Sequence, residues 1–254
     1  MSLMTAFTSA PAQLLCGALA LTSCAADGHA AAAWLQETGG SDTGMAGAGR
    51  AALALDAAAL ASNPAAMASL GGTMVTAVAM PIDLRLEFHG SPETPAHAAD
   101  RANEFTVPAL YAAHRSGRLA YGIAAYSNLG LSFDLGDEWA GRRVIESAGL
   151  SALNIAPAVA WAASERLTLG ASLGAQRMQY EASMAVANDA AYYGPPAGLP
   201  DGQVTLDGAS WAPAGQLGVQ YRVTDRLHLG AAWTSAVEHS ASSNVAARGV
   251  HPVL

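Results

Sequence analysis

The chain has 254 residues, of which 52% are hydrophobic and only 13% are charged, and its formal net charge is −8. Charged residues make up about a quarter of an average soluble domain, so this chain carries roughly half of that share. Beyond its N-terminal region it has no uncharged run of about 18 apolar residues, which excludes a bundle of transmembrane helices, and its apolar content excludes disorder.

The basic residues and the cysteines exclude further classes of protein. All 12 basic residues are arginine, and they form no basic patch along the sequence, so nucleic acid is excluded as a partner. Both cysteines, Cys16 and Cys24, lie near the N-terminus. A chain cleaved after them would have no disulfide and no cysteine nucleophile. The histidines lack metal-binding spacing, and we predict no enzymatic activity, no metal and no cofactor.

The N-terminus has the features of an export signal. Residues 10–26 form an apolar segment of small residues, and the small residues that follow make a plausible cleavage region. We therefore assign residues 1–31 to a signal peptide, although its first residues contain no Lys or Arg. Two alternatives stay open: a lipobox at Leu21–Cys24 that would lipidate Cys24, and a buried core helix.

Residues 32–72 differ from the rest of the chain in being rich in glycine and alanine. Asn63 followed by Pro64 is typical of an N-cap and first-turn proline that open a short helix. Residues 47–52 fit the dinucleotide fingerprint, but no hydrophobic strand precedes them, so the context required for nucleotide binding is absent. We expect this segment to be compact and mostly helical and to fill the lumen of a barrel.

A repeated turn organises the remainder of the chain, residues 73–254. Residues 116–122, 164–170 and 224–230 each consist of a short polar turn followed by alternating apolar and small or polar residues. Alternating residues also precede each turn, so the unit is strand, tight turn, strand. The alternation predicts seven strands, at 73–89, 103–116, 118–132, 149–163, 166–183, 203–223 and 226–243.

The two faces of these strands distinguish a membrane barrel from a soluble β-sandwich. One face is apolar and includes Trp161, Tyr221 and Trp233, whereas the other contains Gly, Ala, Ser and Gln with very few charges. Strands of about ten residues with short turns at one end and long loops at the other favour an outer-membrane barrel. The three aromatic residues lie where strand ends would meet the membrane interface. We predict an all-β fold, an antiparallel transmembrane β-barrel with an N-terminal helical plug.

Four blocks of sequence resemble the outer-membrane transporters of the long-chain fatty acid and toluene type. They are residues 34–40, the segment 47–67 with Asn63-Pro64-Ala65, residues 126–142 with Asp137-Glu138-Trp139-Ala140-Gly141-Arg142, and the stretches 206–211 and 221–239. The resemblance implies a monomeric fourteen-stranded barrel in the outer membrane of a Gram-negative bacterium, occluded by a plug at residues 32–72. It also implies uptake of hydrophobic small molecules, either long-chain fatty acids or aromatic hydrocarbons, with outer-membrane lipid around the barrel. A structural or adhesive barrel without transport is the alternative.

Seven strands are half of the fourteen that the resemblance implies, and bacterial single-chain barrels have even strand numbers. Two open sheet edges would also be costly in a bilayer. We therefore expect this chain to correspond to the N-terminal half of a transporter, a plug and the first half of a barrel.

The resemblance also implies where substrates pass. Capture at outer loops would involve the apolar residues Tyr192, Tyr193 and Leu199. A pocket beside the plug would involve Leu60, Asn63, Pro64, Ala65 and Met67. Exit would be sideways at a kink in the third strand, at Ser127, Asn128, Leu129 and Gly130, where Asn128 and Gly130 interrupt the apolar alternation. Arg222 on the lumen face, and Arg177, are candidate partners of a carboxylate headgroup. For each of these sets, ordinary packing, pairing or a simple bulge is the alternative.

Overall fold

The computed structural model describes residue 35, residues 38–84, residue 86 and residues 103–188, 200–240 and 242–250. The predicted signal peptide and the predicted capture residues Tyr192, Tyr193 and Leu199 lie outside this part of the chain. None of the helices in the described residues is long and apolar enough to cross a membrane.

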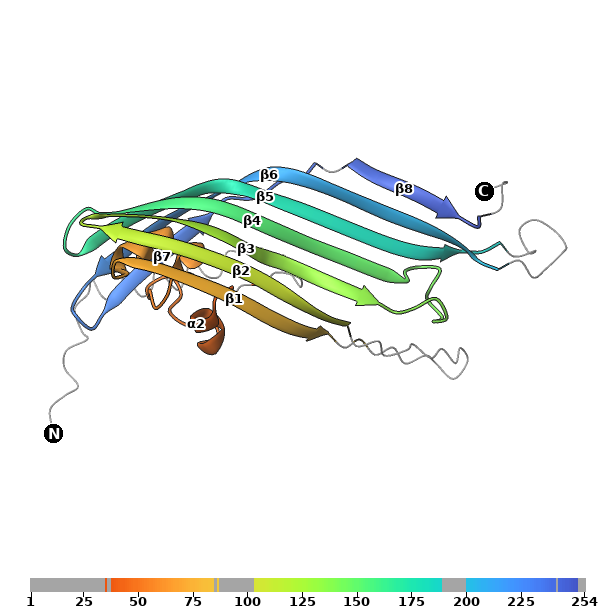
Figure 1. Cartoon of the computed structure of the whole chain (residues 1–254), viewed down its shortest axis with the longest axis horizontal. Coiled ribbons are helices and arrows are strands. Elements are labelled where there is room, and N and C mark those ends of the chain that lie inside the picture. The colour runs from red at the N-terminus through yellow and green to blue at the C-terminus, as the bar shows by residue number, and fades with distance from the viewer. Residues whose placement is uncertain are drawn as a thin grey trace, which may run out of the picture. The chain divides into compact units, whose positions relative to one another are not determined.

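One antiparallel sheet dominates the described residues, and its strands follow one another in sequence order (Figure 1). Its eight strand segments are β1 (Thr73–Leu84), β2 (Asn103–Ser116), β3 (Leu119–Asp134), β4 (Ser147–Ala162), β5 (Leu167–Val186), β6 (Gly202–Arg222), β7 (His228–Thr234) and β8 (Ser242–Arg248). Short turns join β2 to β3, β4 to β5 and β6 to β7 at one end of the sheet. The predicted hairpins are therefore confirmed.

The seventh predicted strand, 226–243, is divided in two. Both β7 and β8 pair with β6, β7 along its second half and β8 along its first half. Between them the register shifts by one residue, since Gln216 pairs with Thr234 but Ala209 pairs with Ser242. The pairing extends to Arg248, beyond the predicted end. An extra residue interrupts the ladder here, as in a β-bulge, so one predicted strand becomes two segments.

The predicted apolar face is the solvent-exposed face of the sheet, as expected of a surface that meets lipid. It carries exposed large hydrophobic side chains along β3 to β7: Leu119, Tyr121, Ile123, Leu153, Ile155, Val159, Trp161, Leu169, Leu173, Leu217, Tyr221, Leu229 and Trp233. Monomeric soluble proteins rarely expose apolar patches of this extent. This distribution supports the membrane-barrel interpretation of the alternation over a soluble sandwich.

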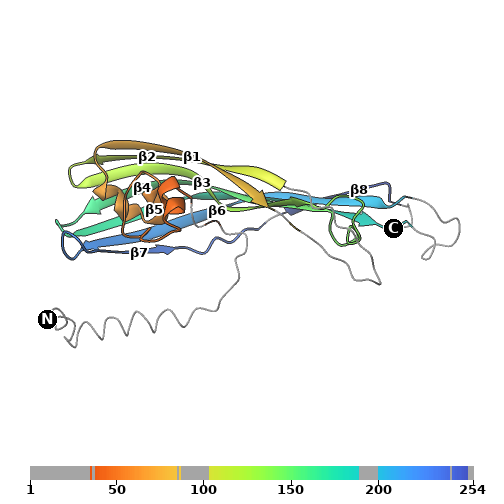
Figure 2. The ribbon, with the colours of Figure 1, turned by 90° about the horizontal axis from the view of Figure 1, so that it is seen from below.

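The opposite face of the sheet, here called the inner face, packs against residues 38–72. Figure 2 shows this N-terminal segment lying inside the curl of the sheet, near the short turns. It contains α2 (Gly40–Gly44), α3 (Ala59–Ser62) and the 3-10 helix η1 (Pro64–Ser69). Its contacts with β2, β3 and β4 form the hydrophobic core, with Leu60, Met67 and Tyr111 fully buried.

Asn63 joins this segment to the sheet and begins η1 as predicted. Its side-chain carbonyl accepts a hydrogen bond from the Ala65 backbone N–H at 3.0 Å. Its amide donates to the backbone carbonyls of Ala51, at 2.7 Å, and of Val219 on β6, at 3.1 Å. A Cβ at Gly218 would lie 1.9 Å from the Asn63 side-chain oxygen, so only glycine allows this approach.

Two groups of outer-face aromatic residues mark where the two membrane interfaces would cross the sheet. Trp161 and Tyr221 lie near the short-turn end, and Trp211 lies ten residues from Tyr221 on the same face of β6. Transmembrane β-strands need about 9–11 residues at a tilt of about 45°, and aromatic residues gather at both interfaces. The lipid-facing band therefore runs from Tyr221 to Trp211, and the strands continue beyond it toward the long loops.

Candidate functional site: an apolar inner wall beside an opening between β2 and β3

The sheet opens between β2 and β3 at the edge of this band that lies nearer the long loops. The two strands pair only from Ala109 with Tyr126 to Ser116 with Leu119. Beyond Tyr126, β3 continues beside β4 alone, while β2 continues beside β1. The β3–β4 register shifts between Ser127 and Leu129, which leaves Asn128 as an extra residue in β3. This bulge falls within the predicted break at 127–130.

Hydrogen bonds hold the bulge in place. The Ser127 hydroxyl lies 2.7 Å from the carbonyl oxygen of Ala152 and 3.0 Å from that of Leu129, so it can donate to either. The Leu35 backbone N–H donates to the Asn128 carbonyl at 2.8 Å. A carbonyl that lacks a strand partner is thus satisfied by the chain N-terminal to the sheet.

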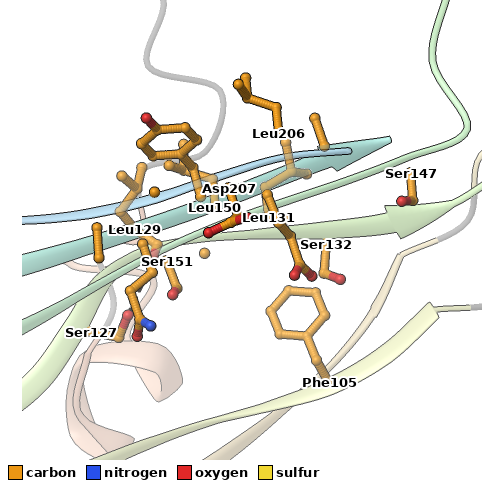
Figure 3. A pocket seen from close by; sticks show the side chains of 18 of the residues that line it. Phe105, Ser127, Leu129, Leu131, Ser132, Ser147, Leu150, Ser151, Leu206 and Asp207 are labelled. Carbon is orange, nitrogen blue, oxygen red and sulfur yellow. Dashed lines mark hydrogen bonds between the residues drawn. The ribbon is translucent and has the colours of Figure 1, made fainter. Parts of the chain in front are cut away.

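A groove of about 1170 Å³ occupies the region beyond the bulge. It is lined by the ends of β2 to β6 and by β8, and Figure 3 shows Phe105 of β2 lying across from the side chains of β3 and β4. Its lining combines the apolar side chains of Phe105, Val107, Leu129, Leu131, Leu150 and Leu206 with polar side chains that include Ser132, Ser147, Gln179, Glu181 and Asp207. This volume exceeds the usual range of small-molecule sites, about 300–1,000 Å³.

The polarity of the two faces reverses in this outer half of the sheet. The register of β4, β5 and β6 is continuous, so residues of one parity share a face along each strand. In the outer half the inner face is apolar, with Met80, Ile82, Leu84, Phe105, Val107, Leu129, Leu131, Leu150, Tyr180 and Leu206. The outer face there is polar, with Ser132, Ser147, Ser151, Gln179, Glu181, Ser183, Thr205, Asp207, Ser242 and Asn244. By this alternation the inner face is apolar where the outer face is polar, and side chains of both sets border the groove.

A row of polar side chains separates the two halves on the inner face. The Asn128 side-chain carbonyl accepts hydrogen bonds from the amides of Asn154, at 2.7 Å, and Gln176, at 3.1 Å. The Gln176 carbonyl lies 3.0 Å from Nε2 of His239, whose Nδ1 is 2.9 Å from the Ser210 hydroxyl. Since the Gln176 carbonyl can only accept, Nε2 carries the proton. We call these five residues the polar row.

The predicted pocket residues of the N-terminal segment are packed rather than exposed. Asn63, Ala65 and Met67 have no exposed surface, and Leu60 and Pro64 are buried as well. In the described residues none of them lines the groove. Their part in a substrate path stays a prediction, as does that of the outer-loop residues outside the described chain.

The two candidate headgroup arginines lie far apart and on different faces. Arg222 shares the inner face with Gly218, at the short-turn end, and its guanidinium donates to the carbonyl of Glu165. Arg177, the other candidate, does not share the inner face. The register of β5 is unbroken, so Arg177 shares the outer face with Leu173, and its guanidinium lies 5.9 Å from the centre of the Trp211 ring. It belongs to the membrane boundary.

The loop between β3 and β4 is fastened to the start of β6 by ion pairs. The Asp201 carboxylate lies 3.0 Å from both the Arg142 and the Arg143 guanidinium groups. Hydrogen bonds from Arg143 hold the pKa of Asp201 below its usual value, against the effect of partial burial, and Arg142 contributes in the same direction. This loop contains the Asp137–Arg142 block, and the Trp139 ring packs over Gly141.

Residues 170–174 fit the Gly-x-Ser-x-Gly pattern of hydrolases, but they lie within β5 rather than at a strand-to-helix turn, so the structural context that a hydrolase requires is absent.

Part of the site could not be predicted from the sequence. The sequence does not predict the contact of Asn154, Gln176 and His239, because it does not show that β4, β5 and the segment between β7 and β8 bring these side chains together. Within the described residues no group of three or more His, Cys, Asp or Glu side chains could hold a metal ion.

Solved structures of outer-membrane transporters share this fold. A FadL homologue of Pseudomonas aeruginosa has a TM-score of 0.68 at 19% identity, over 80% of this chain and 52% of that one. The toluene transporter TbuX of Ralstonia pickettii has 0.65 at 21% identity, over 85% and 62% of the two chains. The CymD monoaromatic hydrocarbon channel has 0.61 at 20% identity, over 84% and 57%. The chain thus spans between half and two thirds of these structures.

The family is identified by a family model that matches the sequence. No curated protein matches the chain. The family model described as outer membrane protein transport protein (OMPP1/FadL/TodX) matches residues 21–252, which is nearly the whole chain. This is a family of transport proteins rather than enzymes. With its curled antiparallel sheet and its N-terminal segment on the inner face, the chain belongs to the OMPP1/FadL/TodX family of outer-membrane transport proteins.

Proposed function

We propose that this chain takes up hydrophobic compounds across the outer membrane of a Gram-negative bacterium, as a monomer surrounded by outer-membrane lipid. The observation that carries the proposal is the reversal of polarity in the outer half of the sheet. An apolar inner face behind a polar outer face offers a hydrophobic molecule a favourable environment inside the wall. A purely structural or adhesive barrel has no need of this arrangement.

The exit route in this proposal is the opening between β2 and β3. The strands part at Tyr126, which is also where the apolar inner face begins and where the lipid-facing band ends. A molecule on the inner face at Leu129 would therefore reach lipid without passing the N-terminal segment, which acts as the plug. The tight burial of Asn63, Pro64 and Met67 supports a sideways route over one through this segment.

Among the described residues, the charged side chains that line the groove are the carboxylates of Glu181 and Asp207, and no arginine lines it. Arg177 faces outward, and Arg222 lies at the opposite end of the strands. The proposal therefore favours uncharged aromatic hydrocarbons over fatty acids, because a buried carboxylate without a partner is costly.

Uptake of radiolabelled toluene and laurate by cells that express the chain tests the proposal. Leu131→Asp places a charge on the inner face, and we expect it to lower uptake at least about tenfold, the effect of about 1.4 kcal/mol. Ala246→Asp adds the same charge at an exposed outer-face position of β8 that does not line the groove, and it should leave uptake unchanged. If neither compound enters faster than in cells without the protein, the structural or adhesive barrel is the better interpretation.

A further inference from the structure

A second pocket, of about 490 Å³, lies on the inner face at the short-turn end. Arg115, Arg118, Arg166, Arg222 and His228 line it, and we call it the basic vestibule. In bacterial outer-membrane barrels the short turns face the periplasm. The vestibule is therefore the periplasmic mouth of the sheet, on the far side of the N-terminal segment from the groove.

The register places these cations on one face. Arg222 shares the face of Gly218 on β6, and it pairs directly with His228 of β7. Arg115 shares the face of the buried residues Tyr111 and Ala113 on β2. Side chains that are far apart in the sequence are thus directed into one opening.

The end of the N-terminal segment forms the roof of the vestibule and is polar. The Ser69 hydroxyl donates to the side-chain carbonyl of Gln220 at 3.2 Å, and both residues line the pocket. The roof presents neutral hydrogen-bonding groups, so it adds no negative charge that would compensate the arginines.

The arginines are not neutralised by acidic partners in the described chain. Arg115, Arg118 and Arg222 each donate to a backbone carbonyl, those of Gly117, Ala163 and Glu165. A guanidinium has five N–H donors, so most of these donors stay available. The lining contains one carboxylate, that of Glu165, against four guanidinium groups. A third of the chain's 12 arginines gather here although its net charge is −8.

We propose that the basic vestibule is a binding site for small anions that carry oxyanion groups, such as phosphate monoesters or carboxylates. Several guanidinium groups around one opening match the bidentate recognition of such groups. This proposal does not rest on hydrophobic uptake, because it uses the other end of the sheet and a different kind of ligand. The oxyanion can come from a free anion or from the headgroup of an amphiphile.

The test uses the full chain in nanodiscs of zwitterionic phosphatidylcholine, with the fluorescent trisulfonate pyranine as the probe. We expect saturable binding, measured by fluorescence polarisation, that weakens as salt is raised. Arg166→Gln should weaken it about tenfold, and Arg118→Gln with Arg222→Gln by more, since charge-assisted hydrogen bonds are lost. Arg166 is suited to the first variant because its guanidinium makes no side-chain hydrogen bond within the described residues.

Arg226→Gln is the matched control, since it removes the same charge from a neighbouring turn outside the vestibule lining. Competition by inorganic phosphate and by hexyl phosphate separates the sources: equal competition indicates a free anion, and stronger competition by hexyl phosphate indicates an amphiphile. Absence of saturable binding overturns the proposal, and so does equal weakening by Arg226→Gln and Arg166→Gln. Heat-modifiable gel mobility confirms that each variant is folded, and toluene uptake reports independently on the groove.

Discussion

The side-chain amide of Asn154 donates a 2.7 Å hydrogen bond to the side-chain carbonyl of Asn128, the extra residue of the β3 bulge. Both side chains are buried. The inserted residue is therefore not a defect at the surface of the sheet, since it is the first member of a polar row that crosses four strands, β3 to β6. The bulge and the row depend on each other, because removal of either partner leaves a buried polar group unsatisfied.

Replacing Asn154 tests this dependence. We expect Asn154→Leu to lower the free energy of unfolding by about 1–3 kcal/mol, because the Asn128 carbonyl loses its shortest hydrogen bond. Urea titration of the protein in lipid vesicles measures the change. Gln179→Leu, on the outer face of β5, is the control and should have little effect. In the double variant with Asn128→Leu the two losses should be less than additive, and full additivity would mean that the residues are not coupled.

The approach of Asn63 to β6 gives a second prediction. A methyl group at Gly218 would overlap the Asn63 side-chain oxygen, so Gly218→Ala should destabilise the packing of the N-terminal segment by about 1–3 kcal/mol. Limited proteolysis should then cut residues 38–72 faster. At Gly215 the nearest atom to an added Cβ is 3.7 Å away, an ordinary contact, so Gly215→Ala should leave the cleavage rate unchanged.

The lipid-facing band predicts that the folding free-energy cost of an added charge depends on its position along the strand. Leu173 is 73% exposed near the middle of the band, so Leu173→Arg should cost about 2–4 kcal/mol of folding free energy in a bilayer. Gln179→Arg lies on the same face of β5 but beyond the Arg177 level, and should cost about 0–1 kcal/mol. Equal costs at the two positions, measured by folding into vesicles, would contradict the assigned boundary.

The outer loop predicts a dependence on pH. The pKa of Asp201 is lower in the folded state than in the unfolded state, because Arg143 and Arg142 favour its charged form. Its stabilising contribution is therefore complete above the usual carboxyl pKa and is lost as the pH falls through the lowered value. Hydrogen exchange in residues 135–146 should accelerate over that acidic range.

A variant isolates the carboxylate at neutral pH. Asp201→Asn should make tryptic cleavage after Arg142 and Arg143 faster, because both guanidinium groups lose their ionic partner. Asp137→Asn, in the same loop, serves as the control. Unchanged cleavage in Asp201→Asn would show that the loop is held by its other hydrogen bonds.

Much of the fold followed from local patterns in the sequence. Alternation along β4 to β7 and the polar turns at 164–166 and 224–226 were sufficient to predict the hairpins and the apolar outer face. The break in the third strand was visible because Asn128 and Gly130 interrupt that alternation.

The rest depended on pairing between strands, which a sequence does not display. One extra residue at Asn128 exchanges the faces of the residues that follow it in β3, so Leu129 and Leu131 turn inward. The orientation of Arg177 required the uninterrupted register of β5, and the extra residue between β7 and β8 became visible only against β6. The basic vestibule was likewise hidden, since its arginines approach one another only after three hairpins have formed.

The exchange of apolar and polar character between the two faces of the sheet has a consequence for any hydrophobic molecule. Between the polar row and the short turns, the apolar face of the sheet is the outer one, which meets the bilayer. Between the polar row and the long loops, the apolar face is the inner one. These two apolar faces meet at a single height, where β2 and β3 are no longer hydrogen-bonded to each other. In the proposed uptake route, a hydrophobic solute would pass from the inner face to the bilayer at this height, so the inserted Asn128 would set the level of that crossing.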